Sequence, residues 1–469
     1  DVYKRQIYKN VPYYDHELTI DSDDLFRKQD DVFYVMDKVL EDYEFASKNV
    51  LVSDTKTGPD GQVITQGVVD AFMSRDMLLM GTKLKYDPAT TTEQMEHVAK
   101  YLQAAKDAAW RVISSNRYSL CPSFHDLFST IDISQTAEVK QEMILWRQYA
   151  TGQVTHAIMT YDRDLTVQGQ SGTKDLINSY LCLNGMPINT TAGVNPQFKG
   201  DKSADNEMYN RDPRLNQTFK DDFYVQYGEY PGYAQSGYKR WLFLNKQHED
   251  DLESTQSFNI TDAPIIRLGE VMLNYIEAAA ELETLGKYTV TQEDVDATIN
   301  KLRTRASFGG KLAKLQIIGG QPAVNGVVFD DADRDPDVPS FLWEIRRERR
   351  VELVYQGFRL NDLKRWRKIH YLNSDLYPKK TIGCWLKKSD QYKNLILCDE
   401  NGIVISNAGN AKGEGYIKVS MTPRNADNGY VLDRNYWDCI PLYEIDYYER
   451  NGSHLEQNPG WPQGGADAE

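Results

Sequence analysis

The segment YVQYGEYPGYAQSGYKRW, residues 224–241, holds the side chains of this sequence best suited to contact a small polar ligand. Its aromatic residues recur at intervals of about three, which fits neither the period of two of a strand nor a sustained helical stripe, and glycine and proline interrupt both patterns. We therefore predict a loop, called here the Tyr-rich segment. Its candidate ligand contacts are Tyr224, Tyr227, Tyr230, Tyr233, Tyr238, Lys239, Arg240 and Trp241.

Aromatic rings on a loop suit the binding of a sugar. A pyranose has an apolar C–H face that can lie on a ring, and hydroxyls that a phenol or a basic side chain can hydrogen-bond. Each stacked ring contributes on the order of 1 kcal/mol beyond the area that it buries. The alternative is that half of these rings pin the loop to the rest of the fold.

A second candidate site is the acidic stretch FDDADRDPDVP, residues 329–339. Asp331, Asp333 and Asp335 match the start of a calcium-binding loop, and carboxylate oxygens suit calcium. However, Pro336 stands where that loop needs glycine, and Leu342 stands where it needs glutamate. A solvated acidic turn is the favoured interpretation, so no metal is expected.

The most basic stretch is IRRERRVELVYQGFRLNDLKRWRK, residues 345–368, in a chain whose net charge is -15. We interpret it as structural: Arg349 and Glu352 are three residues apart and can pair on one helix face. Gly357 is expected to end that helix. The following stretch places Asp362 three residues before Arg365 and four before Trp366, with Leu360 and Leu363 turned inward. A partner-facing basic patch and a phosphate site are the alternatives.

Motifs for catalysis are missing from the sequence. The seven histidines form no HExxH pattern, and there is no GxSxG or Walker loop. A pair of carboxylates for glycoside cleavage stays possible, because acidic residues are abundant. Because abundance of acidic residues is not evidence for such a pair and the other motifs are missing, we do not expect an enzyme.

Composition narrows the class of protein further. The acidic net charge argues against a nucleic-acid partner. Five cysteines lie far apart without a CxxC pair, which predicts scattered core thiols rather than a zinc or redox site. They are Cys121, Cys182, Cys384, Cys398 and Cys439.

Amphipathic helices must position these side chains. Apolar residues recur at helical spacing in residues 30–50, 65–84, 95–113, 265–287 and 291–306. Thr291 followed by Asp294 predicts a start like a capping box for the last of these. Short connections between such helices predict hairpins of the tetratricopeptide type. We expect a mostly α fold with few short strands, in which residues 7–150 and 260–370 form the helical scaffold, 151–259 a loop-rich ligand region, and 371–469 an irregular C-terminal part.

Four stretches, in this order along the chain, resemble motifs of the SusD/RagB family of glycan-binding outer-membrane lipoproteins. They are PIIRLGEVMLNYIEAAAEL, INKLRTRA, ERRVELVYQGFRLNDLKRW and CIPLYEIDYYERNGSHLEQNPGW. The opening IYKNVPYYDHEL is similar to an internal segment of that family, which implies that residues 7–469 are a single domain lacking about the first quarter of the family's length.

The resemblance implies a tetratricopeptide-like scaffold with an irregular binding face, without catalysis or a cofactor. It implies a role in nutrient uptake at the cell surface of Bacteroidota, where the protein would bind an oligosaccharide and deliver it to a SusC-like TonB-dependent transporter. A lipid on an N-terminal cysteine, which none of the five cysteines supplies, would anchor it to the outer membrane. A ligand that is a peptide or another non-sugar nutrient is the main alternative, and a glycoside hydrolase is a further one.

The first six residues, DVYKRQ, can be reverse-translated to a DNA sequence that resembles a transposon end used in preparing sequencing libraries. We therefore expect residues 1–6 to be non-native, and a targeting segment upstream to be absent from this sequence.

Overall fold

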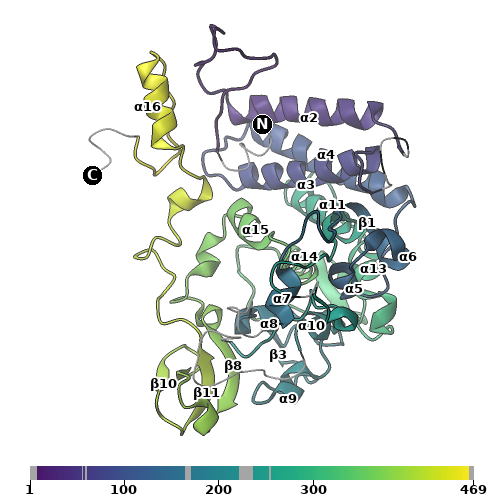
Figure 1. Cartoon of the computed structure of the whole chain (residues 1–469), viewed down its shortest axis with the longest axis vertical. Helices are drawn as coiled ribbons and strands as arrows, with labels where there is room; N and C mark the ends of the chain where they lie inside the picture. The colour runs from purple at the N-terminus through teal and green to yellow at the C-terminus, as the bar shows by residue number, and fades with distance from the viewer. Residues whose placement is uncertain are drawn as a thin grey trace.

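The computed structural model describes residues 8–54, 56, 58, 61–163, 171–220, 236–252 and 255–463. The fold is mostly helical with few short strands, as predicted. Figure 1 shows the long helices side by side at one end of the molecule and strands β8, β10 and β11 at the opposite end.

The long helices form where the apolar periodicity predicted them. α2 spans Val32–Asn49, α3 Gln66–Lys85, α4 Met95–Ser114 and α11 Leu268–Glu283. Met77 of α3, Leu102 of α4 and Leu282 of α11 meet in one buried cluster, each at most 1% exposed. The hairpin scaffold is thus held by side chains that recur every three to four residues.

The predicted helix over residues 291–306 is two helices, α12 (Gln292–Ala297) and α13 (Ile299–Arg303). The predicted capping box is confirmed: the Thr291 side chain accepts from the Asp294 amide, and Asp294 accepts in return from the Thr291 amide. The break falls at Thr298, whose φ of -125° and ψ of -91° are not helical. Its hydroxyl donates to the Asp294 carbonyl at 2.6 Å, a local bond of a kind that competes with helix geometry.

The basic stretch forms α14 (Ser340–Glu352) and α15 (Arg359–Arg365), which meet at a corner. The helix ends earlier than the expected Gln356, and the corner contains two left-handed residues, Tyr355 at φ 59° and Gly357 at φ 84°. Leu363 is buried as predicted, whereas the prediction for Leu360 is wrong, because its side chain is 50% exposed at the start of α15.

The strands form four small antiparallel sheets. In the first, β1 (Met143–Arg147) pairs with β4 (Ala263–Arg267), and Met143 lies opposite Arg267. The second has the order β10-β9-β11-β8, with β8 at Ile382–Lys387, β9 at Leu397–Cys398, β10 at Val404–Ser406 and β11 at Glu414–Lys418. The others join β5 (Gln316–Ile318), β6 (Gln321–Val324) and β7 (Val327–Val328), and β2 (Asn189–Thr190) with β3 (Gly193–Val194).

Short helices fill the rest of the described chain. They are α5 (Asp126–Ser129), α6 (Ala137–Lys140), α7 (Ile158–Arg163), α8 (Lys174–Ser179), α9 (Ala204–Met208), α10 (Pro213–Thr218) and α16 (Leu442–Arg450). Single 3-10 turns are η1 (Ile133–Gln135), η2 (Lys246–His248), η4 (Ala306–Phe308), η5 (Ile369–Leu372), η6 (Pro378–Lys380), η7 (Asp390–Tyr392) and η8 (Asp433–Tyr436). Among the helices of the described ranges, none combines the length and hydropathy needed to cross a membrane.

The cysteines are all free thiols, and four of them are buried as predicted. Cys439 is the exception, because it is exposed just before α16.

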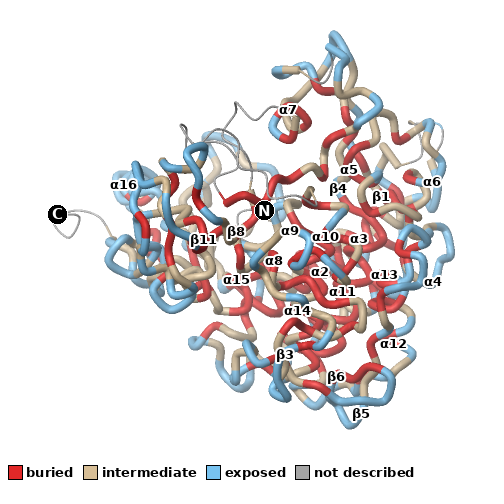
Figure 2. Tube along the Cα trace, turned by 90° about the horizontal axis from the view of Figure 1, so that it is seen from below, coloured by how far each residue is buried: buried red, intermediate tan, exposed pale blue. Residues whose placement is uncertain are grey.

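A network of buried ion pairs lies inside the helical scaffold, where Figure 2 shows buried residues gathered around α11 and α14. Glu352, at the end of α14, accepts hydrogen bonds from Arg214 (2.9 Å), Arg267 (2.8 Å) and Arg305 (2.7 Å). Arg267 and Arg305 also donate to Glu142. All five side chains are at most 3% exposed. The network therefore joins α10, β4, the end of α13 and α14 to the residue that precedes β1.

The predicted pair between Arg349 and Glu352 is wrong, because the Glu352 oxygens are occupied by these three arginines. Arg349 Nε instead lies 3.0 Å from both oxygens of Asp362, which ties α14 to α15 across the corner. Arg365 also donates to Asp362, at 2.9 Å, and reaches Glu277 of α11. The structural interpretation of the basic stretch is confirmed at these residues.

Removing the Glu352 charge by Glu352→Gln is expected to lower the free energy of unfolding by about 3 to 5 kcal/mol, because buried arginines lose their shared counter-charge. Urea denaturation measures this change. Glu96→Gln is the matched control, since Glu96 pairs with Lys287 at 2.9 Å where the side chains are 72% and 47% exposed. It should cost less than about 1 kcal/mol. Equal effects of the two variants would contradict a buried network.

Stability should also fall in acid. Burial alone would raise the pKa of Glu352, but Arg305, Arg267 and Arg214 outweigh burial and lower the pKa to about 2. Lys85 and Arg346 likewise lower the pKa of Glu281 to about 2. A depressed carboxyl pKa contributes stability that is complete above the unfolded value and is lost as pH falls through the folded value. The melting temperature should therefore drop between about pH 5 and pH 2, and less steeply in Glu352→Gln. A flat profile would refute this expectation.

Candidate ligand-binding site

Half of the predicted ligand contacts can be placed. Tyr224, Tyr227, Tyr230 and Tyr233 lie outside the described residues. The described part of the Tyr-rich segment begins at Ser236 and leads through Trp241 toward η2.

Tyr238 and Lys239 are buried inside the fold. The Tyr238 hydroxyl lies 3.0 Å from each oxygen of Glu207, and its side chain is 0% exposed. Burial and the nearby Glu207 carboxylate raise the pKa of Tyr238 well above its ordinary value. Lys239 is 8% exposed. In this structure both side chains are buried, which argues against their predicted role as ligand contacts.

Arg240 is likewise structural. Its Nε donates to Asp162 of α7 at 2.6 Å, and the other Asp162 oxygen accepts from the Phe243 amide at 2.8 Å. Burial raises the pKa of Asp162 in spite of Arg240. The guanidinium also lies over the rings of Phe243 (4.8 Å) and Tyr355 (4.9 Å). Asp162 thus fixes the main chain on both sides of Trp241.

Trp241 is the predicted contact that reaches a cavity. Its indole Nε1 donates to the Asn216 carbonyl at 2.9 Å, which fixes the ring. The ring stacks on His125, with centroids 4.3 Å apart and planes at 29°. Lys246 Nζ lies 4.6 Å from the ring centroid. The result is a pre-positioned aromatic pair with the Lys246 cation over the Trp241 ring.

This pair lines a cavity of about 650 Å³, which we call the Trp241 cavity. Its wall is polar, with side chains that donate and accept hydrogen bonds. Besides the aromatic pair it is lined by Asp126, Ser129, Thr130, Ile131, Asp132, Gln135, Thr136, Asn245, Lys246, Gln247 and His248. An aromatic surface beside many hydroxyl and amide groups is suited to a polyhydroxylated ligand.

A second cavity, of about 600 Å³, lies on the other side of α5 and Phe243, and we call it the Gln356 cavity. It is rich in rings, which come from distant parts of the chain: Phe128, Tyr149, His156, Phe243, Tyr355 and Phe358. Sequence reasoning missed it, because its lining comes from segments far apart in the chain, among them residues 261–267 and 355–358, whose meeting no local spacing signals.

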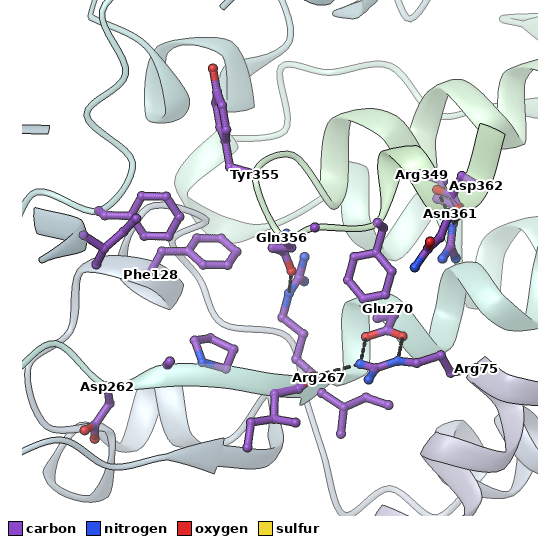
Figure 3. Close-up of a pocket in the computed structure, with 18 of the residues that line it drawn as sticks. Arg75, Phe128, Asp262, Arg267, Glu270, Arg349, Tyr355, Gln356, Asn361 and Asp362 are labelled. Carbon is purple, nitrogen blue, oxygen red and sulfur yellow. Dashed lines mark hydrogen bonds and ion pairs between the residues drawn. The ribbon is translucent and has the colours of Figure 1, made fainter. Parts of the chain in front are cut away.

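Charged residues in the Gln356 cavity are paired within its wall. Figure 3 shows the Arg75–Glu270 pair at one end, Asp262 at the other, and Arg267 reaching Gln356 between them. Arg75 donates twice to Glu270, at 2.6 and 2.7 Å, and Arg267 donates to Gln356 at 3.2 Å. Asp262 accepts from two main-chain amides, those of Ile133 and Tyr149, both at 2.9 Å. Its carboxylate therefore shapes the wall, and burial raises its pKa.

The acidic loop that could hold calcium is neutralised by basic side chains. Asp331, Asp333 and Asp335 lie against Arg347, Lys379 and Lys368, respectively. The described residues contain no group of three or more His, Cys, Asp or Glu arranged to hold a metal. The expectation that no metal binds here stays a prediction, and these ion pairs argue against the alternative of calcium.

Comparison with known proteins identifies relatives of this fold. The model of the SusD family matches residues 141–461. A SusD-like carbohydrate-binding protein of Bacteroides fragilis has a similar structure, with a TM-score of 0.57 and 18% identity over 88% of this chain and 72% of that one.

Two further solved structures are similar. One is a SusD-like protein of the same species, with a TM-score of 0.57 and 19% identity over 97% of this chain and 76% of the other. The other is a SusD superfamily protein of Parabacteroides distasonis, with a TM-score of 0.53 and 16% identity over 98% and 75%. No curated protein sequence matches the chain.

Asp162→Asn should loosen the wall between the two cavities. It leaves Arg240 buried without a counter-charge, so we expect the free energy of unfolding to fall by about 2 to 4 kcal/mol in chemical denaturation. Asp251→Asn is the control, because Asp251 contacts His248 where both side chains are at least 42% exposed, and it should cost less than about 1 kcal/mol. Similar stability of Asp162→Asn and wild type would show that this ion pair does not hold the wall.

Proposed function

Because the chain belongs to the SusD family, we propose that it binds an oligosaccharide at the surface of the outer membrane and passes it to a SusC-like TonB-dependent transporter. The observation that supports sugar binding best is the fixed Trp241 ring beside the polar wall of the Trp241 cavity. The tyrosines at 224, 227, 230 and 233, which lie outside the described residues, stay candidate contacts from the sequence.

The Trp241 cavity meets the two chemical needs of a sugar ligand. The ring supplies a flat apolar surface for the C–H face of a pyranose. Asn245, Gln247 and Thr136 supply amide and hydroxyl groups for its hydroxyls. Because the indole is already held by the Asn216 carbonyl, little conformational freedom is lost on binding.

The proposed activity is binding without turnover. A glycosidase needs one carboxylic acid with a raised pKa that reaches the scissile bond, opposite a second carboxylate. In the Gln356 cavity the Glu270 carboxylate is held by Arg75, and Asp262 accepts two main-chain hydrogen bonds. These partners give both carboxylates structural roles. A site that binds through one or a few stacked rings also releases its ligand readily, which suits transfer to a transporter.

The test is binding of a polysaccharide panel by affinity electrophoresis, followed by calorimetry on the glycan that is retained. Trp241→Ala should weaken that affinity by roughly tenfold, since a lost stacking contact of about 1.4 kcal/mol corresponds to that factor. Its melting temperature should stay close to that of the wild type.

Trp110→Ala is the matched control, because Trp110 is 43% exposed on α4 and lines neither cavity. Tyr149→Ala tests the Gln356 cavity by the same assay. Unchanged affinity in Trp241→Ala with a loss in Tyr149→Ala would move the site to the Gln356 cavity. If a peptide mixture binds and no glycan does, the proposed ligand class changes from sugar to peptide.

A further inference from the structure

A third cavity, of about 680 Å³, lies between α8, the acidic loop 330–337 and the turns η5 and η6. We call it the Arg359 cavity. It is separate from the Trp241 and Gln356 cavities, with which it shares no lining residue. Its rings are Trp343, Tyr371 and Tyr377, and Tyr377 is 37% exposed.

A small recess of about 60 Å³ adjoins this cavity. Four arginines line it: Arg346, Arg347, Arg350 and Arg359. Six of its lining residues also line the Arg359 cavity, so the two spaces lie next to each other and share walls. Among the described residues, no acidic side chain lines the recess. It has room for a group of a few atoms and none for a sugar ring.

The ion pairs around the recess do not neutralise all of its positive charge. Arg346 pairs with Glu281, and Arg347 pairs with Glu344 and Asp331. Arg350 has only Asp175 of α8, and Lys380 donates to the same Asp175 oxygen. One carboxylate therefore serves two cations at this corner.

Arg359 adds a third cation there. Its nearest ring contact is Trp366, whose centroid is 5.8 Å from the guanidinium carbon, and it makes no hydrogen bond or ion pair with any residue that the structure describes. Burial and repulsion from Arg350 outweigh the attraction of Asp175 and Asp362 and lower the pKa of Arg359 to about 9. Burial, Arg350 and Arg359 together outweigh Asp175 and lower the pKa of Lys380 to about 8. An arginine keeps its proton at neutral pH, so this corner holds charge that is poorly compensated.

Two buried polar atoms also lack partners within the described chain. Arg346, which is 5% exposed, has an Nε–H without an acceptor, and it lines the recess. The side-chain oxygen of Asn178, in the wall of the Arg359 cavity, has no donor. Buried polar groups are normally hydrogen-bonded, so an unpaired donor in the recess and an unpaired acceptor in the cavity point to a ligand that supplies both partners.

We propose that the recess binds one anionic group of an acidic sugar, a uronate carboxylate or a sulfate ester, while the sugar ring lies in the Arg359 cavity against Tyr377. This inference rests on the proposed glycan-binding function and names a class of glycan for it. The planar guanidinium fork suits both carboxylate and sulfate oxygens. A hydroxyl of the ring has the Asn178 oxygen as its acceptor.

The charge on the rim favours a ligand with isolated negative groups. Asp333 and Asp337 border the cavity with side chains 62% and 82% exposed. Together with the net charge of -15, they repel a densely charged polyanion such as nucleic acid. A single carboxylate that reaches the recess leaves this repulsion small.

The experiment compares a trimer of galacturonic acid with its fully methyl-esterified form, which keeps the skeleton and removes the charge. Calorimetry at about 50 mM salt limits screening. The wild type should bind the acid form at least about tenfold more tightly, and Arg359→Gln should abolish that preference. A sulfated galactan oligomer replaces the trimer in a second arm, which tells sulfate from carboxylate.

Two controls accompany this comparison. Lys379→Gln removes a cation that lines the Arg359 cavity and not the recess, and should keep the preference. Arg359→Gln should melt at or above the wild-type temperature in buffer without anions, because it removes an uncompensated charge; a lower melting temperature would show a structural arginine and overturn the proposal.

The remaining outcomes separate this proposal from the function on which it rests. If the esterified and acid forms bind the wild type equally, the anionic site is refuted and glycan binding stands. If no glycan binds, sodium sulfate at about 10 mM is the probe, by the shift that bound ligand gives to melting. Stabilisation of the wild type and not of Arg359→Gln would support the recess while refuting the glycan function, and no difference would refute both.

Discussion

The fold depends on one buried electrostatic contact, the carboxylate of Glu352 among three arginines. Its removal from water is costly, and only several well-placed hydrogen bonds make such a buried charge tolerable. Here the partners arrive from α10, β4 and the end of α13. The contact therefore forms only when segments separated by more than a hundred residues are in their native places. It specifies the arrangement of the scaffold more than it adds stability.

Buried charged side chains also fix the walls of the cavities. Arg267 reaches both Glu352 in the core and Gln356 in a cavity wall. Asp162 likewise accepts hydrogen bonds from Arg240 and from the Phe243 amide, and so fixes the segment on either side of Trp241. In both places a charged side chain that faces inward positions uncharged or aromatic groups that face a cavity. The candidate site is thus built from loops, but each loop is fixed by a buried pair.

Local spacing predicts the parts of this molecule that local forces determine. The stripe through α2, α3, α4 and α11 and the capping box at Thr291 follow from neighbours three or four residues apart. The same spacing favoured a pair between Arg349 and Glu352, and this failed because Glu352 has partners from elsewhere in the chain. The prediction of one continuous helix over residues 291–306 failed at Thr298. A threonine hydroxyl that donates to a main-chain carbonyl is compatible both with a continuous helix and with an interrupted one, so the sequence does not reveal the break.

The candidate site was less predictable than the scaffold. Trp241 was identified by composition, whereas the buried places of Tyr238 and Arg240 depend on Glu207 and Asp162, which are 31 and 78 residues away. The recess at Arg359 was hidden for the opposite reason. Its arginines belong to a stretch in which other arginines form ion pairs inside the fold. The sequence does not distinguish Arg359 from Arg349; they differ only in that Arg349 has an ion-pair partner in the three-dimensional structure.

The corner between α14 and α15 lies between two of the cavities. Tyr355 and Gln356 line one of them, and Arg350 and Arg359 line the other. The corner holds Tyr355 in a left-handed conformation that is costly for a residue with a side chain, and its buried hydroxyl has no partner in the described chain. A ligand that shifted this corner from one cavity would change affinity in the other. Thermodynamic reciprocity then requires that the second ligand act back on the first by the same factor.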